Sequence, residues 1–170
     1  MPPSKTAVTP RLLLPLLLLT AAAPPRPRIV AASGQWAALQ QGLTCEAATA
    51  ALRPALKDRP QARASIAFDA ASGRRHGEFA ARLSKTPRDG ASVVLHIDDQ
   101  AFLLVARGDM AWSRGPVQET AIIAALRMGG GMRVEARSPG GGRIVDRFVV
   151  AGAATAIDAA AACAATFVRR

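Results

Sequence analysis

Aromatic residues are scarce in this chain of 170 residues. Phe, Trp and Tyr make up 4% of it, and Tyr is absent. Proteins that bind single-stranded nucleic acid use aromatic side chains as platforms on which bases stack. The formal net charge is +10, but the arginines are scattered along the chain. We therefore expect no nucleic-acid partner. The basic charge favours solubility and, for a partner, an anionic lipid or polysaccharide of the cell envelope or of a host.

Residues that carry catalysis or bind metals are also few. His76 and His96 are the only histidines, and only His96 and Asp98 place two candidate ligands on one strand face. No Gly-x-Ser-x-Gly motif is present, and the glycine runs 129–131 and 140–142 lack the Lys-Ser/Thr of a phosphate-binding loop. We expect no catalytic residues, no metal and no cofactor, and hence no enzyme. The alternative is a periplasmic hydrolase or hydrolase inhibitor. Three or more polar groups converging around His96 in a pocket would favour an enzyme.

Long apolar runs are missing as well. The longest leucine-rich run, residues 12–19, is well below the roughly 20 apolar residues that span a bilayer. Lys5 and Arg11 precede it and small residues follow it, which is the pattern of a cleaved secretory signal. We expect residues 1–22 to be removed, with cleavage after Ala32 as the alternative. The mature protein is then periplasmic or secreted and has no transmembrane anchor.

The rest of the chain divides into a short leader and one domain. Residues 23–35 begin with interleaved Pro and Arg, which predicts an extended Pro/Arg-rich leader. Residues 36–168 are enough for one hydrophobic core and too few for two. We expect a single domain over this range.

Cysteine occurs only twice, at Cys45 and Cys163. In an oxidising compartment a lone pair of cysteines favours a single disulfide, here fastening the start of the domain to its end. No Cys-x-x-Cys motif is present and neither cysteine has a histidine nearby in the sequence. Two buried thiols, a redox pair and a nucleophile are the alternatives.

Apolar and polar residues alternate with period two along much of the domain, which predicts antiparallel strands with one buried face. The clearest cases are residues 64–68, 78–84 and 92–98. Residues 101–106 are apolar without interruption, which predicts a strand covered on both faces.

Two helices are expected. Residues 118–128 have helical spacing, with Ile122, Ala125 and Leu126 on one face, and a glycine run ends this helix. The second helix follows Thr155, which forms a capping-box pattern with Asp158, and carries a stripe of small apolar residues.

A hairpin lies between the two helices. Met132, Val134 and Ala136 alternate with charged residues, and Pro139-Gly-Gly-Gly142 forms the turn before a return strand. Its outer face gathers Arg133, Arg137 and Arg147 around Glu135. This is a possible basic binding face, although a solvated sheet surface has the same pattern. The elements predict a mainly β, antiparallel β-sandwich-like domain with one short inserted helix and a C-terminal helix.

The order and spacing of these residues resemble the invasion-associated locus B family of exported bacterial proteins, over residues 36–164. The resemblance rests on Leu43-Thr-Cys45, Gln100–Leu104, Ala111-Trp112, the helix 121–128, Gly131–Val134, Arg137-Ser138, Gly142, Asp146–Phe148, Gly152, and Ala156–Asp158 leading to Cys163. This chain departs from the family at Phe148, where tyrosine is usual, and at the Pro139–Gly142 turn, which is usually rich in threonine. It also has two cysteines where some members have four. The resemblance implies a β-rich, exported, non-enzymatic domain, linked in some pathogens to host-cell entry.

Overall fold

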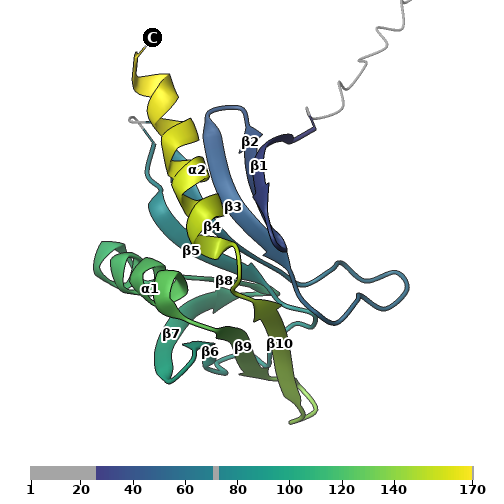
Figure 1. Cartoon of the computed structure of the whole chain (residues 1–170). Coiled ribbons are helices and arrows are strands. Elements are labelled where there is room, and N and C mark those ends of the chain that lie inside the picture. The colour runs from purple at the N-terminus through teal and green to yellow at the C-terminus, as the bar shows by residue number, and fades with distance from the viewer. Residues whose placement is uncertain (1–25, 71–72, 170) are drawn as a thin grey trace, which may run out of the picture.

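The computed structural model describes residues 26–70 and 73–169, so the predicted signal at residues 1–22 lies outside the described residues. All ten strands form one antiparallel sheet in the order β1-β2-β3-β4-β5-β8-β7-β6-β9-β10 (Figure 1). The strands are β1 (Arg28–Ser33), β2 (Trp36–Gln41), β3 (Thr44–Ala50), β4 (Arg63–Asp69), β5 (His76–Arg82), β6 (Val93–Ile97), β7 (Gln100–Arg107), β8 (Met110–Trp112), β9 (Gly131–Arg137) and β10 (Arg143–Val149). The predicted mainly β fold with one inserted and one C-terminal helix is therefore confirmed.

The sheet bends so that its last strand returns to the end of β3. The Leu52 amide donates to the Arg147 carbonyl at 2.8 Å, and the Trp36 indole donates to the Val149 carbonyl at 2.7 Å. The buried Asp146 carboxylate accepts from the Ser84 amide at 2.9 Å. These three bonds join β10 to segments far earlier in the chain, and the inward side chains of both parts of the sheet form one core.

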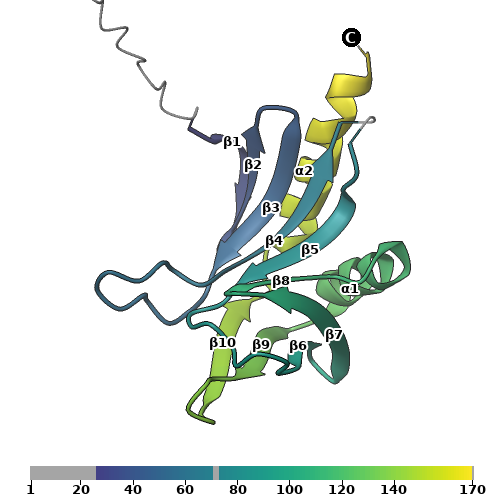
Figure 2. The same ribbon diagram turned by 180° about the vertical axis from the view of Figure 1, so that it is seen from behind.

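Both helices cover the inner side of this bent sheet (Figures 1 and 2). Helix α1 (Pro116–Met128) begins slightly earlier than predicted, because Pro116 suits the first turn of a helix, where its missing N–H costs nothing. Its buried residues are the predicted Ile122, Ala125 and Leu126. Helix α2 (Ala153–Ala165) continues into a short 3-10 helix, η1 (Thr166–Arg169). Among the described residues, no helix has the length and apolar character needed to cross a membrane.

The capping box predicted at Thr155 and Asp158 is wrong. Helix α2 begins earlier, after Gly152, which adopts a left-handed conformation with φ 96°, and no side chain caps this end. The Ala156 amide instead donates to the Gly152 carbonyl at 3.1 Å. Asp158 is thus free to form an ion pair with Arg127 at the end of α1.

The prediction that residues 101–106 are covered on both faces is also wrong. In β7, Leu104 is 4% exposed, but Leu103 and Val105 are 41% and 51% exposed. The helices lie on the inner side of the sheet only, so the outward side chains of β7 face solvent. Hydrophobicity alone therefore marked a strand here without showing how many of its faces are covered.

The sheet begins before the domain boundary that we expected at residue 36. Residues 28–33, predicted to belong to an extended leader, form β1 and pair with β2. Ile29 and Val30 favour a strand, and Gly34, with φ 57°, permits the tight turn into β2. The interleaved prolines and arginines of the leader end at Arg28, the first residue of this strand.

The turn between β1 and β2 packs directly against the turn between β10 and α2. A Cβ added to Gly152 would lie 1.9 Å from the Ser33 carbonyl oxygen, and one added to Gly34 would lie 2.6 Å from that of Ala151. Only glycine permits backbones to approach this closely. The first hairpin is therefore fastened to the C-terminal part of the chain.

The two cysteines are joined by a disulfide between β3 and α2. The Cys45 and Cys163 sulfurs are 2.02 Å apart, and their Cα atoms are 6.1 Å apart. Both residues are buried. The bond holds α2 against the sheet at the edge of the stripe Ala153, Ala156, Ile157, Ala160 and Ala164, whose small side chains let the helix lie close to the strands.

Candidate binding face

The outer surface of the β9–β10 hairpin gathers arginines from both strands. Arg133 lies opposite Arg147 in the register, and Arg137 lies opposite Arg143. The residues between them, such as Val134 and Ile144, are buried. We call Arg133, Arg137, Arg143 and Arg147, with Glu135 in their midst, the basic face.

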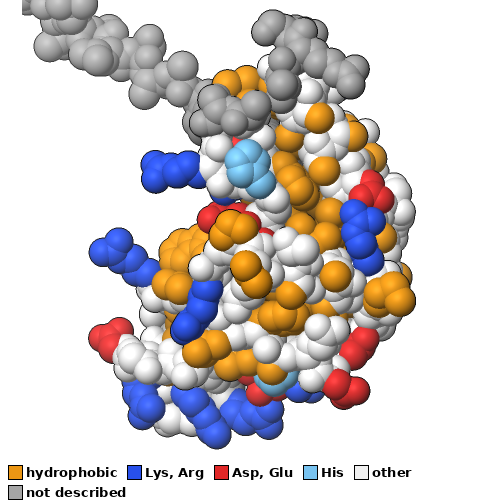
Figure 3. All heavy atoms as spheres, turned by 90° about the vertical axis from the view of Figure 1, so that its left-hand side faces the viewer, with side chains coloured by type: hydrophobic (Ala, Val, Ile, Leu, Met, Phe, Trp, Pro, Cys, Tyr) orange, Lys and Arg blue, Asp and Glu red, His pale blue; other side chains and the backbone are white. Residues whose placement is uncertain are grey.

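The predicted Arg133, Arg137 and Arg147 therefore lie on one surface, and Arg143 joins them. The sequence prediction missed Arg143. Arg143 and Arg147 are four residues apart on the return strand and therefore share a face, so this spacing could have identified Arg143. Figure 3 shows Lys and Arg side chains along the lower end of the molecule, which is the end where β9 and β10 meet in Figure 1.

Glu135 is the acid at the centre of the basic face. Its carboxylate accepts from Arg133 Nε at 2.6 Å and from Arg143 Nη2 at 3.1 Å. The Arg133 hydrogen bond, aided by that from Arg143 and opposed by partial desolvation, holds the pKa of Glu135 below its usual value. Among the described residues, neither Arg137 nor Arg147 has an acidic side chain within ion-pair distance. The face therefore keeps a surplus of positive charge.

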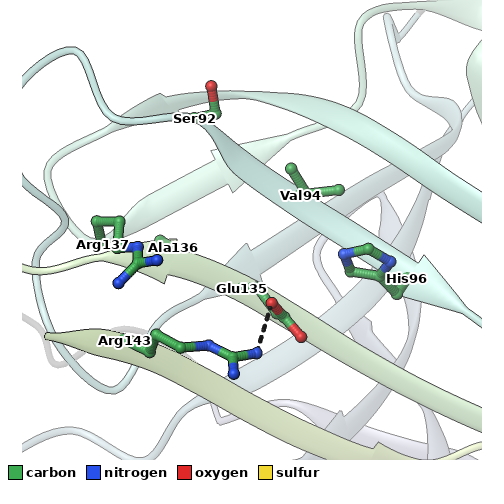
Figure 4. Close-up of a pocket in the computed structure, with 7 residues that line it drawn as sticks. All are labelled: Ser92, Val94, His96, Glu135, Ala136, Arg137 and Arg143. Carbon is green, nitrogen blue, oxygen red and sulfur yellow. Dashed lines mark hydrogen bonds and ion pairs between the residues drawn. The ribbon is translucent and has the colours of Figure 1, made fainter.

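A shallow depression of ≈ 390 Å³ lies between the basic face and β6 (Figure 4). Strand β6 pairs with β9 so that Val94 lies opposite Glu135 and His96 lies opposite Arg133. The depression is lined by Ser92, Val94, His96, Glu135, Ala136, Arg137 and Arg143. A negatively charged group placed here would contact guanidinium groups on one side and His96 on the other.

Polar groups do converge near His96, which is the arrangement that we set as favouring an enzyme. Glu135 is held ionised between two arginines, and Ser92 points away from the ring of His96 (Figure 4). The described residues show no hydrogen bond between Ser92 and His96.

Asp98, the other predicted partner of His96, forms its hydrogen bonds with a different part of the chain. It occupies a left-handed turn position, and its carboxylate accepts from the Gly130 amide at 2.9 Å and the Gly131 amide at 2.8 Å. It therefore fixes the loop that joins α1 to β9. The described part of the chain holds no cluster of three metal-binding side chains.

A second charged cluster connects β3, β4 and the turn before β5, in the first half of the sheet. Asp69 accepts from Thr44 Oγ1 at 2.8 Å and from Arg75 Nη2 at 2.8 Å. The Arg75 hydrogen bond is the main reason why the pKa of Asp69 falls to about 2. Nearby, burial raises the pKa of Glu78 above its usual value. We call Asp69, Thr44 and Arg75 the matched cluster, because its acid and base neutralise each other.

Comparison with solved structures found a protein of similar fold. No protein-family model matches the sequence, and no curated protein matches it significantly. Among solved structures, the chain is similar to the crystal structure of invasion associated protein b from Bartonella henselae. The TM-score is 0.55 at 16% sequence identity, and the match covers 79% of this chain and 97% of that chain. At this identity the likeness shows a shared fold, and it confirms the fold that the resemblance implied.

Proposed function

We propose that this protein is exported and acts in the cell envelope by binding an anionic component, either a lipid headgroup or an acidic polysaccharide, through the basic face. One observation carries the proposal: four arginines from neighbouring strands share a surface with a single acid. Arginine is suited to this role because its planar donors match carboxylate and phosphate groups.

Three further observations support export. Residues 1–22 have the charge and hydrophobicity of a secretory signal. The cysteine pair is bonded, and structural disulfides persist mainly in oxidising compartments. The fold matches that of an invasion associated protein. An invasion role is not part of the proposal.

Fractionation of native cells with chemical crosslinking tests export and reveals the neighbours of the protein. We expect a shortened chain in the periplasm or the medium, whose unreduced mass is lower by the hydrogens of both thiols. A full-length chain in the cytosol with two alkylatable cysteines would contradict export.

A charge-reversal pair tests the binding face. The variant Arg137→Glu/Arg147→Glu should elute from immobilised dextran sulfate at lower salt, with an affinity about tenfold lower or more, since each basic residue near an anionic surface contributes about 1 kcal/mol. The control Arg74→Glu/Arg114→Glu changes the net charge equally at two exposed sites on other elements. Equal losses in both variants would assign binding to net charge and remove the basic face from the proposal.

Hydrolysis is the second candidate, because polar groups surround His96. If the depression is catalytic, His96→Ala should abolish turnover of an ester or glycoside substrate. We expect no turnover in the wild-type protein, since Glu135 is held between arginines. Activity that depends on His96 would replace binding with catalysis.

A further inference from the structure

The segment that joins β3 to β4 projects from the body of the molecule (Figures 1 and 2). Residues 52–60 are all exposed, including Leu52 at 53% and Leu56 at 68%. We call residues 52–60 the β3–β4 loop. Exposed leucines at a projecting loop place apolar surface where a partner can reach it.

The β3–β4 loop is held in shape by Gln61. The Gln61 side chain donates to the Ala51 and Arg53 carbonyls at 2.9 and 3.0 Å, and accepts from the Ala55 amide at 2.6 Å. The Arg59 amide closes a turn on the Leu56 carbonyl at 3.1 Å. Because this turn is already formed, presenting Leu56 to a partner costs little additional ordering.

Basic side chains surround the apolar tip. Arg53, Lys57 and Arg59 lie in the loop with one acid, Asp58. Lys85, from the segment after β5, lines a small depression of ≈ 120 Å³ together with Leu56. The tip thus combines an apolar side chain with a surplus of positive charge.

The base of the loop adjoins the basic face. The Leu52 amide donates to the carbonyl of Arg147, so the loop and β10 meet there. Apolar side chains flanked by Lys and Arg are the arrangement that binds anionic membrane surfaces, where the apolar group enters the acyl boundary and the cations contact phosphates.

We infer that the β3–β4 loop docks the protein on an anionic bilayer. Leu56 enters the boundary between headgroups and acyl chains, and Arg53, Lys57 and Arg59 contact the lipid phosphates. Charge complementarity selects this partner over a neutral membrane. The inference does not depend on export or on the basic face, because vesicle binding is measured on the purified chain.

The first experiment measures cosedimentation with vesicles of equimolar phosphatidylglycerol and phosphatidylcholine. Leu56→Asp should bind about tenfold more weakly, since it removes the apolar side chain that enters the bilayer and adds a charge. Leu43→Asp is the matched control, because Leu43 is 63% exposed at the opposite end of β3. Arg59→Glu should weaken binding about tenfold, whereas Arg74→Glu, in the turn before β5, should have a much smaller effect.

A second experiment reports insertion directly. The indole of Leu56→Trp should shift its fluorescence to the blue when these vesicles are added, and that of Leu43→Trp should not. Vesicles of phosphatidylcholine alone should leave both spectra unchanged. The inference is overturned if wild-type protein ignores the anionic vesicles, if Leu43→Asp loses as much binding as Leu56→Asp, or if the Leu56→Trp spectrum does not move. Retention on dextran sulfate without vesicle binding would leave the basic face as a polysaccharide site and remove the loop as a membrane element.

Discussion

Charged side chains are paired differently in the two halves of the sheet. In β1–β5, the matched cluster places one carboxylate, Asp69, against Arg75 and Thr44. In β6–β10, the basic face shares one acid, Glu135, among several arginines. The first half is also held by the disulfide and α2. Asp69 and Arg75 therefore neutralise each other, whereas Arg137 and Arg147 have no acidic partner among the described residues. We propose that these two arginines are the ones available to a partner.

Removing the disulfide should cause the largest loss of stability, because it releases α2 from β3 in the first half of the sheet. The double variant Cys45→Ser/Cys163→Ser should lose about 4 kcal/mol of unfolding free energy, given a loop of 118 residues. Urea unfolding of the oxidised protein and of the variant measures this difference. Reduced wild-type protein is the control and should match the variant. Unchanged stability in both would show that packing alone holds the helix.

Gly152→Ala should disrupt the contact between the β1–β2 turn and the β10–α2 turn, which fastens the first hairpin to the C-terminal part of the chain. The new Cβ would collide with the Ser33 carbonyl at a position whose φ already disfavours side chains, so we expect a loss of about 2–3 kcal/mol. Gly108→Ala is the control, since Gly108 also has positive φ but no atom within 4 Å of the added Cβ. It should lose only about 1 kcal/mol. Equal losses, measured by urea unfolding, would contradict the close packing.

Asp69→Asn should show how much the matched cluster stabilises the fold, because this stabilisation depends on pH. The pKa of Asp69 is lowered from 3.8 to about 2, so ionised Asp69 stabilises the fold above pH 4 and loses this effect as the pH falls to 2. After allowance for partial solvent exposure, the contribution is about 1–2 kcal/mol.

Unfolding curves at pH 7 and at pH 2 measure that contribution. The variant should be less stable than wild type at neutral pH, and most of this difference in stability should disappear at pH 2. Asp99→Asn, at an exposed turn position, is the control and should behave like wild type at both pH values. A constant difference between Asp69→Asn and wild type would show that the carboxylate charge is not responsible.

Glu135→Gln should have the smallest effect on stability and the most informative effect on binding. Its arginine partners, Arg133 and Arg143, are 37% and 61% exposed, and exposed ion pairs contribute less than about 1 kcal/mol. Retention on dextran sulfate should increase, because the basic face loses its only acid. Glu46→Gln, which removes an ion pair with Arg63 in the first half, is the matched control. Equal retention of the two variants would show that the halves do not differ.

The sequence predicted the hairpin well and β7 poorly for the same physical reason. Alternation of apolar and charged residues fixes which side of a strand is buried, as in residues 132–136. An unbroken apolar run such as 101–106 lacks this information, and whether a helix covers its outer side depends on the whole fold.

Contacts between distant segments were beyond sequence reasoning. The pairing of Arg75 with Asp69 and the commitment of Asp98 to two glycine amides depend on how separate turns meet. The disulfide could be predicted because the chain offers only one possible pair of cysteines.

The return of β10 to β3 also bears on how the chain assembles. Contacts between Leu52 and Arg147, and between Cys45 and Cys163, join segments that are made far apart in time during synthesis. Such distant pairings slow folding, because a long stretch must be ordered before they form. The disulfide can form only after both cysteines, 118 residues apart, have been synthesised, and a single pair of thiols leaves no alternative pairing within the chain.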